Sequence, residues 1–363
     1  MDELFQSFDL NVLKLPNRIV MSAMTRTRAS ENDVPTDLMR EYYVQRASAG
    51  LIVTECTQVS DQGHGIIRAP GLHRPDQIAA WRKITDAVHA AGGRIYCQIW
   101  HCGRVAHPDM RDGAPPVGPS PIAATGDFVL PTGRVDFTIP QELSIDEISG
   151  IVSDFAKATQ NARQAGFDGV ELHGANGYLQ DQFLQDGSNH RTDAYGGTVE
   201  NRARLMLETA KAMIDAWSSE RIGVRLSPSS HLYGVDDSDK LATFGFVVRA
   251  LDALRVGYLC LLEPNAKDAE RGVQIPNVAE TFRPMTSVPI MVNTGFDKSK
   301  ANAILVKGDA DLVAFGVPYI ANPDLVERFR SDAPLSKPDP SRFYGADAKG
   351  YTDYPPLQAV TAD

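Results

Sequence analysis

Cysteine is scarce in this sequence, and long apolar runs are missing. Four cysteines in 363 residues, none in a CxxC pair, exclude a disulfide framework and predict reduced thiols (Cys56, Cys97, Cys102 and Cys260). No apolar run is long enough to span a bilayer, and residues 1–7 lack the basic and apolar regions of a signal peptide. We therefore expect a cytoplasmic protein that does not insert into membranes.

Positive charge is also short. The chain has 36 Lys and Arg against 46 Asp and Glu, a formal net charge of -10. This balance disfavours nucleic acid and anionic membranes as partners and leaves small molecules. The oligomeric state, a monomer or a homodimer, stays open. No His, Cys, Asp and Glu set has the spacing of a metal site, and no nucleophile elbow is present.

What the sequence does contain is a series of short apolar runs, each followed by an amphipathic segment. Nearly continuous apolar runs are typical of parallel strands that are covered on both faces. They occupy residues 19–24, 51–57, 94–100, 169–173, 222–226, 257–262, 288–292 and 311–316. The helices between them have their own signals, which are a capping box at Ser144 and Glu147, N-caps at Asp76, Thr198 and Asp297, and a final Gly308.

Two α/β architectures fit eight strand–helix units, an open doubly wound sheet and a closed barrel. No G-x-G-x-x-G follows any strand, which makes a dinucleotide-binding open sheet less favourable. We predict a (β/α)8 TIM barrel in which residues 1–363 form a single domain. Residues 103–141, with seven prolines, form a long excursion after the third strand. Because a barrel has its active site at the carboxyl ends of its strands, we predict a lid or pocket wall there, the alternative being a packed surface loop.

Polar residues gather at those same strand ends, where side chains project into the site. They are Thr25, Thr54, Glu55, Cys56, Thr57, Gln98, Trp100, His101, His173, Asn176, Tyr178, Arg225, Asn293 and Thr294. Singly, each has a structural alternative, such as a satisfied polar group for Gln98, a buried ion pair for Arg225 or a core histidine for His173. Their shared location favours a site. Small residues at the last two strands, Gly295 and Gly316, are typical of phosphate binding by backbone N–H groups.

At these residues the sequence resembles the Old Yellow Enzyme family of flavin ene-reductases, in the branch with the yeast enzyme, plant oxophytodienoate reductases and nitrate-ester reductases. The resemblance covers nearly the whole chain. It is carried by residues 17–26 (NRIVMSAMTR), 98–104 (QIWHCGR), 173–179 (HGANGYL), 191–197 (RTDAYGG), 200–202 (ENR), 321–325 (ANPDL) and 350–355 (GYTDYP).

The resemblance implies FMN, bound non-covalently across the barrel mouth. Gln98 would pair with the pyrimidine edge, since an amide has both a donor and an acceptor. Arg225 would lie near N1 and the C2 carbonyl, where a cation stabilises the reduced ring. Thr25 would donate toward the C4 carbonyl. The remaining contacts would come from Ala23, Met24, Cys56, Gly295, Gly316 and Val317.

The same resemblance implies the chemistry of an NADPH- or NADH-dependent enzyme that reduces the activated C=C bond of an α,β-unsaturated carbonyl or nitro compound. Hydride would reach the substrate from flavin N5. His173 and Asn176 would bind the substrate's oxygen as charge develops there, and Tyr178 would donate a proton to the α-carbon. Trp100, Tyr351 and Ile66 would shape the pocket, Ile66 standing where a tyrosine is frequent.

Two positions depart from the family pattern. Val317 follows Gly316 where an arginine usually contacts the FMN phosphate, and Thr294 stands where glycine is usual, so we expect weaker FMN retention. Three alternatives stay open at this point. They are a nitroaromatic or nitrate-ester reductase, a non-flavin barrel lyase or isomerase whose Arg225 and Gln98 bind substrate directly, and a silent binding protein that has lost the cofactor.

Overall fold

A closed parallel barrel forms the centre of the computed structural model, which describes residues 2–357. Each barrel strand pairs with the next in parallel, and the last pairs with the first. The strands are β3 (Ile19–Met21), β4 (Leu51–Val53), β6 (Ile95–Trp100), β11 (Gly169–Gly174), β12 (Ile222–Leu226), β13 (Tyr258–Leu262), β14 (Ile290–Asn293) and β15 (Leu312–Phe315). A short β5 (Thr57–Gln58) continues beside β6. The predicted (β/α)8 barrel is confirmed.

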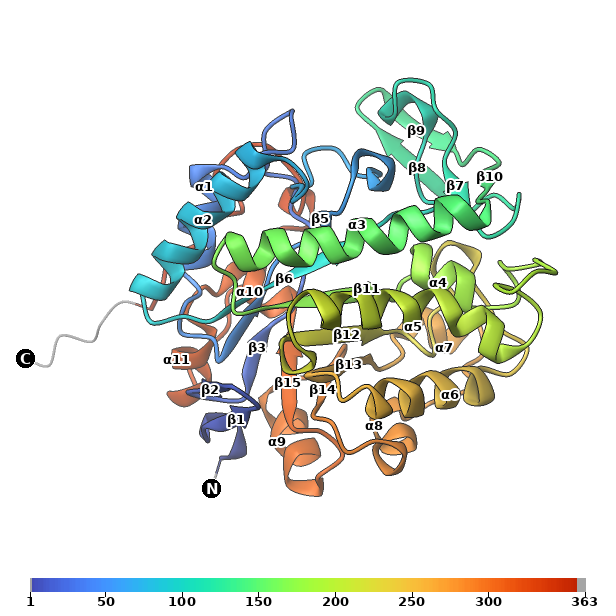
Figure 1. The fold of residues 1–363 in the computed structure, drawn as a ribbon. Helices are drawn as coiled ribbons and strands as arrows, with labels where there is room; N and C mark the ends of the chain where they lie inside the picture. Colours follow the sequence, from blue (N-terminus) through green and yellow to red (C-terminus); the bar gives the residue numbers. More distant parts are fainter. Residues whose placement is uncertain (1, 358–363) are drawn as a thin grey trace, which may run out of the picture.

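Helices surround the barrel, as Figure 1 shows. They are α1 (Asp37–Val44), α2 (Pro75–Ala90), α3 (Ile145–Gln164), α4 (Leu179–Leu184), α5 (Val199–Ala216), α6 (Lys240–Ala253), α7 (Ala266–Glu270), α8 (Val278–Phe282), α9 (Lys298–Lys307), α10 (Val317–Ala321) and α11 (Leu325–Arg330). Short 3-10 turns cover Glu3–Phe5, Asp61–Gly63, Pro108–Met110, Ser219–Arg221, Leu232–Gly234, Arg283–Met285 and Pro340–Arg342.

The helix-end signals are confirmed with one exception. Ser144 and Glu147 form the capping box of α3, Thr198 and Asp297 accept N-terminal amides of α5 and α9, and Gly308 ends α9 in the left-handed conformation. Asp76 is not a cap. Arg74 is the N-cap residue of α2, and the helix begins at Pro75 because proline fits the first helical position. Asp76 therefore lies within the first turn of the helix.

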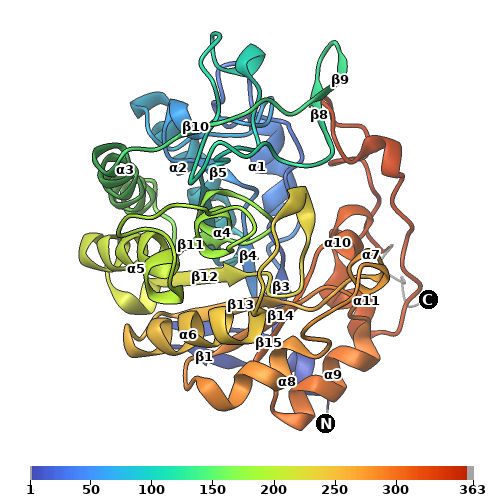
Figure 2. The ribbon, with the colours of Figure 1, turned by 90° about the vertical axis from the view of Figure 1, so that its right-hand side faces the viewer.

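The 103–141 excursion contains a small sheet of its own. Strands β8 (Asp127–Leu130) and β9 (Gly133–Asp136) form an antiparallel hairpin, visible at the upper right of Figure 2, and β7 (Val117–Gly118) pairs with β10 (Gln141–Glu142). Phe128 and Phe137 of this segment are buried in one apolar cluster with Trp100 and Tyr178. The excursion therefore packs against the carboxyl ends of the barrel strands.

A hairpin that the sequence did not predict covers the opposite end of the barrel. Strands β1 (Phe8–Leu10) and β2 (Leu13–Leu15) are antiparallel. Leu10 and Leu15 are fully buried in the same cluster as Tyr96 and Tyr258, which point into the barrel. This end is closed by apolar side chains, so the polar interior opens only toward the excursion.

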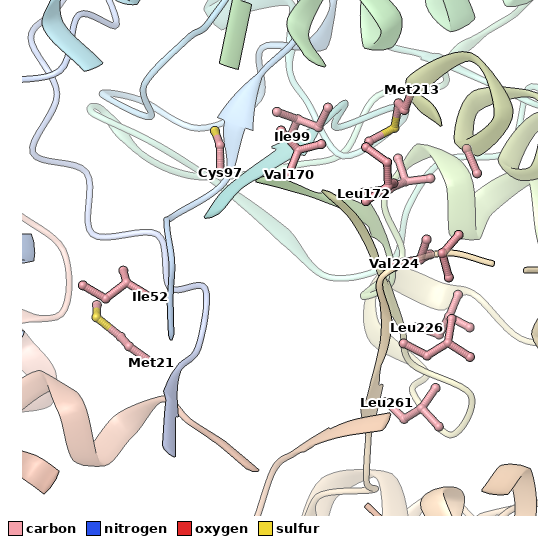
Figure 3. Close-up of a cluster of buried hydrophobic side chains, with 14 of the residues drawn as sticks. Met21, Ile52, Cys97, Ile99, Val170, Leu172, Met213, Val224, Leu226 and Leu261 are labelled. Atoms are coloured by element: carbon pink, nitrogen blue, oxygen red, sulfur yellow. The ribbon is translucent and has the colours of Figure 1, made fainter. Parts of the chain in front are cut away.

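The side chains of the barrel strands alternate between two environments, as strand geometry requires. Figure 3 shows those that point toward the helices, and they belong to the main apolar cluster, among them Ile99, Val170, Leu172, Val224, Leu226 and Leu261. The residues between them face the barrel interior. On the central strands these inward residues include Gln98, Trp100, Glu171, His173, Arg225 and Cys260.

Candidate active site

The register between neighbouring strands places their inward-facing side chains at the same levels along the barrel axis. Glu171 is paired with Gln98 across β11 and β6, and His173 is paired with Arg225 across β11 and β12. Because parallel neighbours at the same level of a barrel point the same way, four residues from three strands meet near the mouth. The sequence-predicted cluster of Gln98, His173 and Arg225 is therefore brought together by register alone.

Gln98 is held at both ends of its amide. Its Nε2 donates to Glu171 Oε1 at 2.6 Å, and its Oε1 accepts from Cys56 Sγ at 3.1 Å. Glu171 also accepts from the Tyr258 hydroxyl at 2.8 Å. Burial raises the pKa of Glu171, an effect that the charge of Arg225 opposes. These contacts fix the orientation of the amide and leave it one further proton and one further lone pair.

Arg225 has neutral hydrogen-bond partners. Its Nη1 donates to Ser22 Oγ at 3.1 Å and its Nη2 to Asn293 Oδ1 at 2.9 Å. Its Nε is buried and has no partner within residues 2–357. Within these residues the hydrogen-bond partners of Arg225 are all neutral and no carboxylate lies in ion-pair contact with it, which argues against the structural ion pair.

His173, Tyr178 and Trp100 form an aromatic cluster at the mouth. The Tyr178 ring lies edge-on to Trp100 at 4.6 Å and to His173 at 5.0 Å between centroids. Burial, and then the charge of Arg225, lower the pKa of His173 well below its ordinary value, so the imidazole is neutral. Burial raises the pKa of Tyr178 well above its ordinary value, so the phenol keeps its proton.

Asn176 lies in the turn between His173 and Tyr178. It adopts φ 58° and Gly177 follows with φ 74°, so two consecutive residues are left-handed. Asparagine tolerates this region better than most residues. A Cβ at Gly177 would lie 2.5 Å from the carbonyl oxygen of Leu232, which explains glycine there. Asn176 is half-buried, with its side chain on the same turn as the His173 and Tyr178 rings.

Residues 23–25 and Cys56 form one rim of this mouth. Ala23, Met24 and Thr25 are half-buried, and Cys56 is buried. Burial raises the pKa of Cys56 to about 12, so it is a neutral thiol that donates to Gln98. Glu55, one of the polar residues expected at the end of the second strand, holds this rim because its Oε2 accepts from the Arg26 amide at 3.2 Å. Burial raises its pKa to about 7.

A cavity of about 820 Å³ opens outward from Tyr178. Its walls are mostly apolar and include Ile66, Val105, Phe128, Phe137, Tyr233 and Tyr344. The hairpin of the excursion and the segment 344–346 thus face each other across it. Tyr351 is not among the described residues that line this cavity. Its ring is fully buried and stacks on Tyr42 at 4.0 Å, so it supports the rim from behind.

The ends of β14 and β15 offer backbone groups with little side-chain cover. Thr294 and Gly295 are consecutive left-handed residues, with φ 84° and 79°. A left-handed backbone is unusual for a β-branched residue such as Thr294, whereas glycine adopts it without strain. This explains why glycine is the usual residue at this position. Gly316 precedes α10, and Val317 is 55% exposed.

Similarity to known proteins agrees with this geometry. Residues 3–336 match the model of the NADH:flavin oxidoreductase / NADH oxidase family. The 12-oxophytodienoate reductase 2 of Arabidopsis thaliana is 40% identical over 98% of this chain and 96% of its own. Morphinone reductase in complex with tetrahydroNAD superimposes with a TM-score of 0.92 at 42% identity, covering 98% of both chains. An Old Yellow Enzyme homologue from Zymomonas mobilis has a TM-score of 0.94 at 40% identity, covering 98% and 100%.

The chain therefore belongs to the NADH:flavin oxidoreductase family, with the Old Yellow Enzyme fold. It is a flavin-dependent oxidoreductase that acts on small molecules with a nicotinamide as reductant. The residues present fit FMN. Arg225 Nε, Trp100 Nε1 and His173 Nδ1 are three buried polar atoms without partners in the described chain, and all lie at the mouth. A group with acceptors on its edge and face would satisfy them.

Residues 2–357 contain neither a membrane-spanning helix nor a candidate metal site. No helix among residues 2–357 combines the length and the apolar character that crossing a bilayer requires. The same residues gather no group of three or more His, Cys, Asp or Glu side chains that could hold a metal ion.

Several supporting residues escaped sequence reasoning. Glu171 had a usable signal, because it is a lone charge in an apolar run and two residues before His173, hence on the same strand face. Tyr233, in the short 3-10 turn Leu232–Gly234, and Asp181, on α4, had none, since their positions depend on how these segments pack against the barrel.

Proposed function

We propose that this protein is an ene-reductase that reduces the activated C=C bond of α,β-unsaturated carbonyl or nitro compounds with NADPH or NADH. The proposal rests mainly on one observation. Tyr178, which keeps its proton, lines the mostly apolar cavity, and the neutral His173 ring lies against it without lining the cavity itself. The turn of Asn176 connects these two residues. This arrangement suits an apolar substrate with a single polar end.

When bound non-covalently, FMN supplies a hydride acceptor and donor at N5. Gln98, Arg225 and Thr25 would hold its ring, with Ala23, Met24, Cys56, Gly295, Gly316 and Val317 along its edges and phosphate. Arg225 would offer its unpaired Nε and a positive charge, which favours the reduced ring. Gln98 would present the free proton and lone pair that its contacts with Glu171 and Cys56 leave over.

The remaining steps belong to this chain's own side chains. His173 and Asn176 donate hydrogen bonds to the substrate's carbonyl or nitro oxygen, where negative charge grows during reduction. Tyr178 gives its proton to the α-carbon and regains one from solvent. Trp100 packs against Tyr178 and keeps its ring in place. Tyr351 would shape the site indirectly, through the rim that it supports.

A nitroaromatic or nitrate-ester reductase is the second candidate, because the same oxygen-binding donors accept a nitro group. Family membership disfavours the non-flavin lyase or isomerase. The silent binding protein requires that FMN does not bind.

One experiment distinguishes these functions. The protein is incubated with FMN, free flavin is removed, and NADPH or NADH and then 2-cyclohexenone are added without oxygen. We expect a yellow protein that bleaches, recovers its colour on enone addition, and releases the saturated ketone.

We also propose that the barrel and the 103–141 excursion act as one domain, the excursion being a pocket wall. Its Phe128 and Phe137 line the cavity with Ile66 on the barrel side. An Ile66→Tyr variant should lose turnover with bulky cyclic enones by a few-fold and keep turnover with small ones, because a phenol narrows an apolar wall. A panel of 2-cyclohexenones with 3- to 5-position substituents measures this, and an unchanged order of kcat/KM would dismiss it.

Val317 leads to a prediction about the cofactor itself. A Val317→Arg variant should bind FMN more tightly by roughly 10- to 150-fold, the equivalent of one charge-assisted hydrogen bond of about 1.5–3 kcal/mol. Val317 is exposed at the start of α10, so a longer side chain there has room. Fluorescence titration of the apoprotein measures the Kd. Val306→Arg on α9 is the control, because Val306 is also an exposed helical valine, with 71% of its surface exposed. Sub-nanomolar binding by the unmodified protein would contradict the expected weakness.

A further inference from the structure

We infer that Ser227 and Asp181 are positioning residues for the substrate-binding turn, and that they hold Asn176 and Tyr178 in place through one hydrogen-bonded relay. The inference rests on the proposed ene-reductase function, which assigns roles to those two residues. Neither Ser227 nor Asp181 lines the cavity, and their side chains hydrogen-bond to the turn, to Gln185 and to each other. Both are buried, with 1% and 0% of their surfaces exposed.

The relay begins in the left-handed turn. The Asn176 amide donates to Ser227 Oγ at 2.8 Å, and the Gly177 amide donates to Asp181 Oδ2 at 2.9 Å. Ser227 Oγ in turn donates to the same Asp181 oxygen at 3.4 Å. The Asp181 carboxylate therefore binds one turn amide directly and the other through the Ser227 hydroxyl.

The carboxylate is fixed from its other side. Gln185 Nε2 donates to Asp181 Oδ1 at 2.7 Å. Gln182 Nε2 closes the turn by donating to the Gly177 carbonyl at 2.7 Å and to the Cys102 carbonyl at 3.0 Å. Asp181 and Gln182 both belong to α4, which begins directly after Tyr178. The helix therefore holds the turn from which Asn176 and Tyr178 project.

This arrangement explains why the turn keeps an energetically unfavourable backbone. A left-handed asparagine costs about 1 kcal/mol or more unless its surroundings impose the conformation. The Ser227 hydroxyl and the Asp181 carboxylate impose it, because both turn amides would otherwise be buried without acceptors. Loss of either group lets the turn relax, and a displacement of about 1 Å at a reacting group can reduce a rate by roughly 10²-fold.

The experiment compares serine variants in the FMN-loaded enzyme. Ser227→Ala should lower kcat for enone reduction about tenfold or more and raise KM for the enone, with the FMN Kd unchanged. Ser227→Thr, which restores a hydroxyl, should recover most of the loss. Ser229→Ala is the matched control, because Ser229 is a buried serine two residues later that donates only to the Ile275 carbonyl. It should behave as the wild type.

The pH profile adds a second readout. Burial raises the pKa of Asp181 to about 6, and the charge of Lys240 opposes this effect. Arg104 is the other charged group that faces it. The carboxylate is therefore present above about pH 6 and lost below it. The wild-type rate of enone reduction should fall as pH falls through 6, and Asp181→Asn, slower throughout, should lack that step.

Each outcome decides the inference. If Ser227→Ala matches Ser229→Ala, or if Ser227→Thr is as slow as Ser227→Ala, the relay does not position the turn. If Asp181→Asn keeps the wild-type step near pH 6, the Asp181 carboxylate is not the titrating group. The proposed role of Asp181 in the relay is then refuted. A wild-type protein that binds FMN but reduces no enone refutes the proposed function instead, and circular dichroism of the variants identifies any simple loss of folding.

Discussion

A Tyr178→Phe variant should accept hydride from NADPH or NADH as fast as the wild type, yet reduce an enone roughly 10²- to 10⁴-fold more slowly. The two half-reactions separate because only the second needs a proton on carbon. The phenol is suited to that task, since burial raises its pKa well above the ordinary value and it keeps its proton across the working pH range. Stopped-flow absorbance of the flavin band measures each half-reaction.

The size of the rate loss in Tyr178→Phe depends on whether another proton donor can reach the α-carbon. The Tyr178 ring is 8% exposed and is bordered by Trp100, His173 and Tyr233. Of these, His173 is neutral and already committed to the substrate oxygen, tryptophan is no acid, and Tyr233 is the one other phenol, with its ring 5.9 Å from that of Tyr178. Water can replace the phenol only by entering an apolar site. The loss in Tyr178→Phe should therefore be partly relieved by nitroalkenes, whose reduced form needs no proton on carbon to leave the enzyme.

Tyr344→Phe is the control for this prediction. Tyr344 lines the same cavity and carries the same hydroxyl, but it is 66% exposed at the outer edge. Its loss should change enone reduction by less than about twofold. Equal rates for Tyr178→Phe and the wild type would assign the proton to solvent and remove Tyr178 from the catalytic set.

The barrel and the positions of its polar residues were predictable for one physical reason. Parallel strands buried on both faces read as apolar runs, so a polar residue within a run such as Gln98 or Arg225 must face the interior of the barrel. Register then brings His173 beside Arg225 without further information. The family motifs added roles to these positions but did not change where they lie.

Other parts could not be predicted because they depend on packing between distant segments. The 103–141 excursion has too many prolines to show its hairpin, whose strands are only four residues each. Tyr351 was expected at the pocket surface, yet its ring stacks on Tyr42 near the Arg28 guanidinium, 4.7 Å away. The Ser227 hydroxyl meets the Asn176 amide across 51 residues, a pairing that no local pattern encodes.

Removal of the oxygen-binding side chains is the second change from which we expect a large effect. His173→Ala should slow enone reduction roughly 10²- to 10³-fold, the loss measured elsewhere for a single oxyanion donor, and Asn176→Ala should do nearly the same. Burial and Arg225 lower the pKa of His173, so it donates from a neutral ring. Its protonation should therefore not appear in the rate near neutral pH, and any step near pH 6 should vanish in Asp181→Asn, not in a His173 variant.

The control and the decisive comparison use the same assay. His64→Ala removes an imidazole from the outer cavity wall and should leave the rate within about twofold. If His173 and Asn176 bind one oxygen atom, the double variant should lose less than the product of the two single losses, because residues that share a partner are not additive. Independent, fully multiplicative losses would mean that the two side chains serve different atoms, and the substrate would then lie across the site in a different orientation from the one proposed.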